Sequence, residues 1–87
     1  MPEVSRFFGV IIYMYLKDHV PPHFHAKYGE YEAVFSIETG EIFHGDLPKK
    51  QMRLVQAWTE LHRTELSENF RLLGTEKATY FKIKPLE

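Results

Sequence analysis

Cysteine is absent from the sequence, which excludes disulfide bonds, thiolate metal sites and a cysteine nucleophile. A charge excess is absent too, because 11 Lys and Arg residues face 12 Asp and Glu residues, for a net charge of -1. No global field therefore draws the protein to nucleic acid or to an acidic membrane, and any basic site must be local. The apolar run at residues 7–16 is at most about half as long as a membrane-spanning helix, and no signal-peptide cleavage pattern follows it. We expect a soluble, cytoplasmic protein.

Apolar residues are abundant for a chain of 87 residues, since 44% are hydrophobic and 15% are aromatic. This composition supplies enough apolar area to offset chain entropy, which argues against intrinsic disorder. The length suits one modest core, and no repeat, low-complexity segment or composition shift divides the chain. We predict a single domain over residues 1–87.

The first part of the chain has the pattern of β-structure. Both alternate sets of residues 7–16 are apolar, which predicts one central strand covered on both faces. Residues 19–23 include two prolines, and they predict a stiff extended connection. Residues 23–28 then alternate between apolar and polar side chains, which is typical of a half-buried strand. The polar set, which we expect to point away from the core, is His23, His25 and Lys27.

Gly29-Glu30 is predicted to form a two-residue hairpin turn, because glycine at its first position accepts the positive φ of a type II′ turn. This turn sets a register that pairs Tyr28 with Tyr31, Lys27 with Glu32, Ala26 with Ala33, His25 with Val34 and His23 with Ser36. The side chains of the second strand that face the core are then Tyr31, Ala33, Phe35 and Ile37. Thr39-Gly40 marks a further turn, with a bulge, into a short strand over residues 41–44.

A long helix follows. Asp46 as N-cap and Pro48 in the first turn predict a helix that runs to Leu73 and ends at Gly74. Its predicted apolar half carries Leu54, Val55, Trp58, Leu61, Leu66, Phe70 and Leu73. Residues 80–85 alternate again, and they predict a short last edge strand. The predicted fold class is α+β: an antiparallel meander of about four strands packed by one long C-terminal amphipathic helix.

Three histidines, His19, His23 and His25, lie within seven residues. Strand alternation aims His23 and His25 to one side, and the stiff connection brings His19 alongside. Three neutral imidazoles in this arrangement suit Zn²⁺ or another divalent metal, with a fourth position open for water. The alternative is that the His-x-His pattern only places ordinary polar side chains on the solvent-exposed face of a strand. No cofactor is then required.

A cluster of basic residues marks the predicted start of the helix. Lys49, Lys50 and Arg53 lie where the helix macrodipole disfavours cations. Three cations beside free helix N–H groups would suit a phosphate. The competing interpretation is that exposed lysines at a helix start cost little and carry no function.

Polar residues interrupt the apolar half of the same helix. His62 lies near the middle of this half, with Glu65 and Asn69 on its flank, and burial of such groups requires hydrogen bonds. His62 is either a satisfied core histidine or, since imidazole titrates near neutral pH, a general acid or base.

The whole chain resembles a bacterial family known as domain of unknown function family 4160. The stretches that carry the resemblance include Gly9-Val10-Ile11-Ile12, Pro21-Pro22-His23-Phe24-His25-Ala26, Tyr28-Gly29-Glu30-Tyr31-Glu32-Ala33, Gly45-Asp46-Leu47-Pro48 and Leu61-His62. The chain departs from the family pattern where Val20 replaces a frequent asparagine, where Phe70 replaces a common tryptophan, and over residues 75–80. The resemblance implies a small protein paired with a member of domain of unknown function family 2442, and such pairs have been proposed as toxin and antitoxin.

Two functional hypotheses follow. In the first, a toxin-like protein, bound by a cognate small antitoxin-like protein, cleaves RNA without a metal. His23 or His25 would abstract the ribose 2′-hydroxyl proton, another imidazole would protonate the leaving oxygen, and Lys49, Lys50 or Arg53 would stabilise phosphate charge. This mechanism requires the histidines and the helix start to share one cleft. In the second, a non-catalytic module uses the His19, His23 and His25 cluster to bind a metal or a protein partner.

Overall fold

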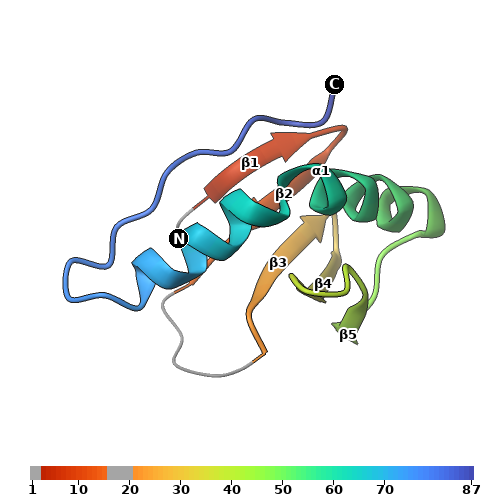
Figure 1. Ribbon diagram of the computed structural model, residues 1–87. Coiled ribbons are helices and arrows are strands. Elements are labelled where there is room, and N and C mark those ends of the chain that lie inside the picture. The colour runs from red at the N-terminus through yellow and green to blue at the C-terminus, as the bar shows by residue number, and fades with distance from the viewer. Residues whose placement is uncertain (1–2, 16–20) are drawn as a thin grey trace.

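The computed structural model describes residues 3–15 and 21–87. One antiparallel sheet contains β1 (Glu3–Phe7), β2 (Val10–Tyr13), β3 (His23–Tyr28), β4 (Tyr31–Ser36) and β5 (Ile42–Gly45). The strands follow one another in the order β1-β2-β3-β4-β5, and the helix α1 (Lys49–Leu73) comes after them. The predicted α+β meander with one long C-terminal helix is confirmed, with five strands. Figure 1 shows α1 lying across one face of the sheet and the C-terminal tail running back beside β1.

The prediction of a single strand over residues 7–16 is wrong. Phe8 and Gly9 both have positive φ, at 48° and 81°, and they form a tight turn that pairs Phe7 with Val10. Two short strands, β1 and β2, therefore replace one long strand. The continuous apolar pattern concealed this turn, because the solvent-exposed turn residue Phe8 is itself apolar. The predicted end of that strand and the connection over residues 19–20 lie outside the described residues.

The β3–β4 hairpin has the predicted register at every pair, from His23 opposite Ser36 to Tyr28 opposite Tyr31. Gly29 has the positive φ that the turn requires, at 58°. One predicted core residue is misplaced, since Tyr31 is half exposed at the end of the sheet while Ala33, Phe35 and Ile37 are buried. Alternation places a side chain on a face of the sheet, but Tyr31 stands where that face is no longer covered.

The link from β5 to α1 differs from the predicted cap. Pro48 is the N-cap, and no side chain caps the helix. Asp46 is exposed, and its backbone N–H donates to the carbonyl of Glu32 at 3.1 Å. Asp46 therefore closes the β4–β5 ladder and does not cap α1. The helix ends at Leu73 with Gly74 as C-cap, as predicted.

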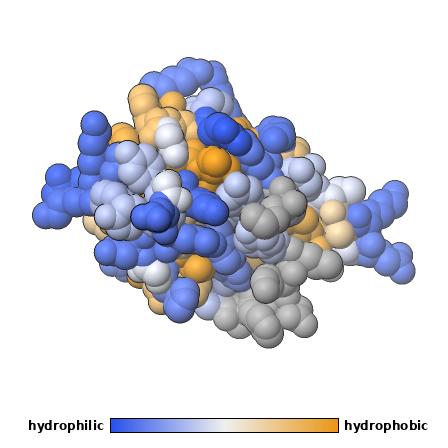
Figure 2. Space-filling model, turned by 180° about the vertical axis from the view of Figure 1, so that it is seen from behind, coloured by the Kyte–Doolittle hydropathy of each residue, from blue (hydrophilic) through white to orange (hydrophobic). Residues whose placement is uncertain are grey.

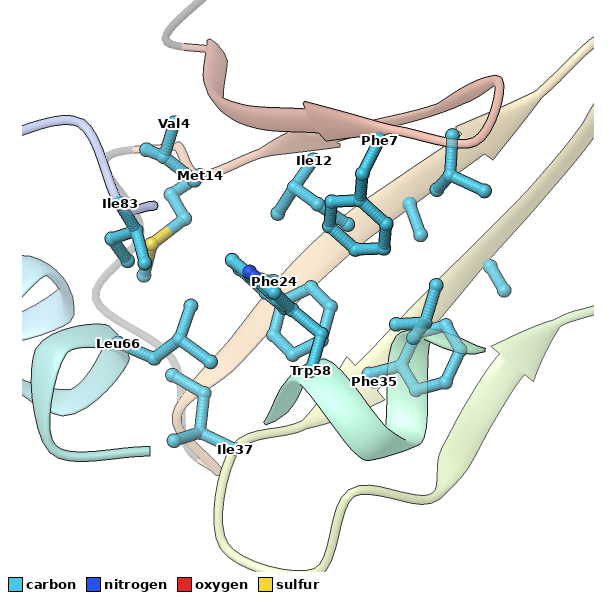
Figure 3. Close-up of a cluster of buried hydrophobic side chains, with 14 of the residues drawn as sticks. Val4, Phe7, Ile12, Met14, Phe24, Phe35, Ile37, Trp58, Leu66 and Ile83 are labelled. Carbon is cyan, nitrogen blue, oxygen red and sulfur yellow. The ribbon is translucent and has the colours of Figure 1, made fainter. Parts of the chain in front are cut away.

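The core lies between α1 and the sheet, where the indole of Trp58 packs against Phe24 and Phe7 (Figure 3). Val55, Trp58, Leu66 and Leu73 are buried as predicted. Leu61, however, is 69% exposed. Three residues advance a helix by 300°, so Leu61 lies about 60° beyond Trp58 and outside a buried stripe narrower than half the cylinder. The buried stripe also includes the polar residues Thr59 and Asn69.

The C-terminal tail is not the predicted edge strand. Residues 79–87 form no ladder with the sheet, and a single backbone hydrogen bond joins them to β1, from the N–H of Ile83 to the carbonyl of Val4 at 2.8 Å. Side chains of α1 hold the tail instead. The sequence predicted buried and exposed side chains in alternation over residues 80–85, but only Ile83 among them is buried, at 3% exposed.

Candidate functional site

His23 and His25 lie on the face of the sheet opposite the buried Phe24 and Ala26, and we call this side the outer face. Their rings lie 5.5 Å apart. The strand register also places Tyr13 and Val34 on this face, since both are aligned with His25. Figure 2 shows the molecule from behind, where hydrophilic and intermediate side chains predominate and hydrophobic areas are small. The sequence pattern thus brings two imidazoles together on a largely polar surface.

The ring of His23 is fixed in position and in tautomer. Its Nδ1 lies 3.0 Å from the carbonyl oxygen of Pro21. Since a carbonyl only accepts, Nδ1 carries the proton, and in the neutral ring Nε2 holds the lone pair. The rings of Phe43 and Phe70 lie 6.1 Å and 5.5 Å away. His23 is therefore held between β5 and the last turns of α1, with Nε2 as the atom that can take a proton.

His25 is more enclosed than His23. Its side chain is 17% exposed, and both ring nitrogens are buried. The carboxylate of Glu32 lies 3.6 Å from Nδ1, close enough for an ion pair when the ring is protonated. The ring of Tyr15 meets His25 edge-on at 4.6 Å. His25 is thus placed to orient neighbouring groups, while His23 is the more accessible of the two.

Aromatic rings continue along the outer face from His25. Tyr13 and Tyr15 are stacked with ring centroids 6.3 Å apart. Burial raises the pKa of the Tyr15 phenol, and the nearby Glu32 carboxylate and Tyr13 raise it further. Tyr15 therefore holds its proton to higher pH than an ordinary tyrosine.

The predicted phosphate-binding residues do not lie beside the histidines. Lys49, Lys50 and Arg53 are exposed in the first turns of α1. His23 contacts Phe70, which follows Arg53 by 17 residues in the same helix. At 1.5 Å per residue the path along the helix between them is about 25 Å, interrupted by a kink at His62. The expectation of one cleft shared by the histidines and the helix start is therefore wrong, because α1 runs the length of the sheet and places its start at the far end.

His62 lies in a third part of the molecule, apart from the His23–His25 pair and from the start of α1. Its Nδ1 is hydrogen-bonded to the carboxylate of Glu65, and its ring packs against Trp58 at 5.6 Å. His62 also has non-helical backbone angles, φ -124° and ψ 24°, within α1. The predicted neighbour relation of His62 and Glu65 is confirmed. Its contact with the core residue Trp58 puts His62 on the inner side of the sheet, away from His25.

The metal hypothesis has no support in the described part of the chain. Among residues 3–15 and 21–87, no three His, Asp or Glu side chains gather in a way that could hold a metal ion. His19, the third predicted ligand, lies outside the described residues. The structure thus supplies His23 and His25 as a pair, without a third ligand from the described chain.

Three outer-face residues escaped the sequence prediction of the site: Tyr15, Glu32 and His44. The predicted hairpin register could have identified Glu32, since it lies diagonally across from His25 on the neighbouring strand. His44 is exposed and aligned with Val34, which is itself aligned with His25, so it shares their face. Its position depends on the bulge between Val34 and Phe35, and this bulge could not be located from the sequence.

Comparison with known proteins identifies a family but no activity. The model of the family described as Domain of unknown function (DUF4160) matches residues 9–71, a shorter span than the end-to-end resemblance seen in the sequence. No curated protein and no solved structure matches the chain. Among the described residues, no helix combines the length and the apolar character that crossing a membrane demands.

Proposed function

Because the chain belongs to the DUF4160 family, a domain of unknown function, we propose a function from the chemistry of its outer face: histidine-based cleavage of RNA by a toxin-like protein, which a cognate small antitoxin-like protein holds inactive. The toxin-like role rests on the family resemblance, and the cleavage rests on the residues. The observation that carries the proposal is the orientation of His23, whose Nδ1 is hydrogen-bonded to the carbonyl of Pro21, on an outer face that also presents His25 and His44.

His23 supplies the general base. Its Nδ1 proton is engaged by Pro21, so Nε2 of the neutral ring takes the proton of a ribose 2′-hydroxyl. The 2′-oxygen attacks the adjacent phosphorus, and the 5′-oxygen leaves with a proton from a protonated imidazole. The products are a 2′,3′-cyclic phosphate and a 5′-hydroxyl, and the step needs no metal.

The second imidazole is assigned by exposure. The ring nitrogens of His25 are buried, so His25 and its partner Glu32 act as positioning residues for His23. His44 is exposed on the same face and is the candidate proton donor. Lys27 is exposed two residues beyond His25, and it takes the phosphate-binding role that the distant helix start cannot perform.

The test is inducible expression of the wild type and of single alanine variants, followed by measurement of growth and RNA integrity. We expect His23→Ala to restore growth and to leave RNA intact, with normal thermal unfolding. The matched control is the triple variant Lys49→Ala, Lys50→Ala, Arg53→Ala, which should remain as toxic as the wild type. Harmless expression of the wild type, or cleavage that survives in His23→Ala, would refute the proposal.

A chemical control identifies the mechanism. Purified protein is incubated with a short RNA and with the same strand carrying a 2′-deoxy nucleotide at the cleaved position. The proposal requires a 2′,3′-cyclic phosphate from the first strand and no cleavage of the second, because the 2′-hydroxyl is the nucleophile. Cleavage of both strands would exclude this chemistry.

A further inference from the structure

The backbone of the C-terminal tail is held by hydrogen-bonding groups of Asn69, Trp58 and Val4. We call these three residues together the seat of the tail. The side-chain amide of Asn69, a fully buried residue, donates from Nδ2 to the carbonyl of Phe81 at 2.8 Å. The backbone N–H of Phe81 donates back to Oδ1 of Asn69 at 2.9 Å. Asn69 thus satisfies both backbone groups of one tail residue, as a neighbouring strand would.

Two further hydrogen bonds extend this seat along the tail. The indole N–H of Trp58 donates to the carbonyl of Lys84 at 2.9 Å, and the N–H of Ile83 donates to the carbonyl of Val4 at 2.8 Å. The side chain of Ile83 is buried, next to Val4 and Met14 (Figure 3). All four bonds engage the tail through its backbone, so the seat fits the tail of any copy of this chain equally well.

The hinge between α1 and the tail is strained. Ala78 has a φ of 48°, in the left-handed region that disfavours residues with a Cβ atom. Ala78 ends a turn that is closed by a hydrogen bond from its N–H to the carbonyl of Thr75 at 3.0 Å. An opened hinge would release Ala78 into an extended conformation at the loss of this one bond.

We infer that two copies of this chain exchange their tails, each tail filling the seat formed by Val4, Trp58 and Asn69 of the other copy. The contacts in the seat are the same in the closed monomer and in the exchanged dimer, so hinge strain and chain concentration decide between them. The closed form benefits from an effective concentration in the millimolar range. Formation of each dimer relieves the strain at two hinges. This relief favours the exchanged dimer enough for it to form when the protein is concentrated.

Sedimentation equilibrium of the full-length chain tests this inference through the hinge residue. Ala78→Gly removes the left-handed penalty from the closed monomer and should weaken the dimer about 30-fold, since two hinges are involved. Ala78→Val raises the penalty and should tighten the dimer relative to the wild type. A chain that stays monomeric up to millimolar concentration, or a dimer of equal affinity in all three proteins, would overturn the inference. If Ala78→Val fails to fold, the wild type and Ala78→Gly decide alone.

Cross-linking shows whether the tails are the parts exchanged. The chain has no cysteine, so one copy can carry Glu3→Cys and another Lys82→Cys, next to the bonded pair Val4 and Ile83. Oxidation of the mixed, concentrated proteins should form mainly a disulfide between position 3 of one chain and position 82 of the other. The two symmetric disulfides, which join position 3 to position 3 or position 82 to position 82, should be less abundant. A dimer fraction that contains only symmetric disulfides, or none, would refute tail exchange.

Discussion

The indole N–H of Trp58 donates to the backbone carbonyl of Lys84 at 2.9 Å. This bond satisfies the one polar atom of a fully buried side chain, and it ties the middle of α1 to the tail. The same ring packs against Phe24 of β3 with centroids 5.7 Å apart. Trp58 therefore joins the sheet, the helix and the tail, and the stability of all three should depend on it.

Replacement of Trp58 measures this dependence. Trp58→Ala should lower the free energy of unfolding by about 3–5 kcal/mol, because it leaves a large cavity. Leu61→Ala, three residues later on the exposed side of α1, should change it by no more than about 0.5 kcal/mol. Urea denaturation of both variants checks the pair, and equal losses would mean that the helix face is assigned incorrectly.

Asn69 offers a test of the tail contacts. Asn69→Leu keeps the side-chain size but leaves the N–H and carbonyl of Phe81 without their partner. The free energy of unfolding should therefore fall by about 2 kcal/mol. Ser67→Ala, at an exposed position two residues earlier, serves as control and should be nearly neutral. Hydrogen exchange at the Phe81 amide should accelerate in Asn69→Leu alone, and unchanged protection there would contradict the assigned bonds.

The β3–β4 hairpin was the most predictable part of the fold, since strand alternation and one glycine determine its register. The β1–β2 turn was not, because Phe8 and Gly9 stand in an unbroken apolar run. The predicted edge strand in the tail was wrong for another reason. The partners of the tail are Asn69 and Trp58, which lie far from it in the sequence. Local patterns predict strands and turns, but they do not show which side chains of a helix will bind a distant segment.

Gly29 and Gly45, two glycines with positive φ, should respond very differently to substitution. A Cβ atom on Gly45 would stand 2.2 Å from the carbonyl oxygen of Glu32, whereas a Cβ atom on Gly29 would meet nothing. Both have positive φ. Gly29→Ala should therefore cost only the backbone penalty, about 1 kcal/mol, and Gly45→Ala about 3 kcal/mol or more. Thermal unfolding compares them, and similar losses would argue against the close approach of β4 and β5.

The site was predictable only in part, and the limit has a geometric cause. Alternation along one strand placed His23 and His25 together, because a strand has only two faces. The relation between the histidines and Lys49 depends on how α1 lies across the sheet, and that direction is not encoded in any local spacing. The contact of His23 with Phe70 settles it, since it brings the last turns of the helix to the histidines.

Metal removal separates the two functional hypotheses. Elemental analysis of protein purified without chelator should find no stoichiometric zinc, and EDTA should leave RNA cleavage unchanged, because the proposed chemistry uses imidazoles alone. The control is the variant His23→Ala, which should have the same metal content as the wild type. One zinc per chain that is lost in His23→Ala would instead support the metal-binding module with His19, His23 and His25.

The phenol of Tyr15 reports on the electrostatics of the outer face. Its pKa is raised from about 10, chiefly by burial and also by Glu32. The folded protein thus holds this proton more tightly than the unfolded chain does, so stability should fall as pH rises above 10. Glu32→Gln should lower the pKa of Tyr15 and reduce this alkaline loss, whereas Glu38→Gln, at another exposed position, should not. Phenolate absorbance, with Tyr15→Phe to identify the contribution of Tyr15 among five tyrosines, follows the titration. An unchanged pKa in Glu32→Gln would show that Glu32 does not face Tyr15 and that burial alone raises the pKa of this phenol.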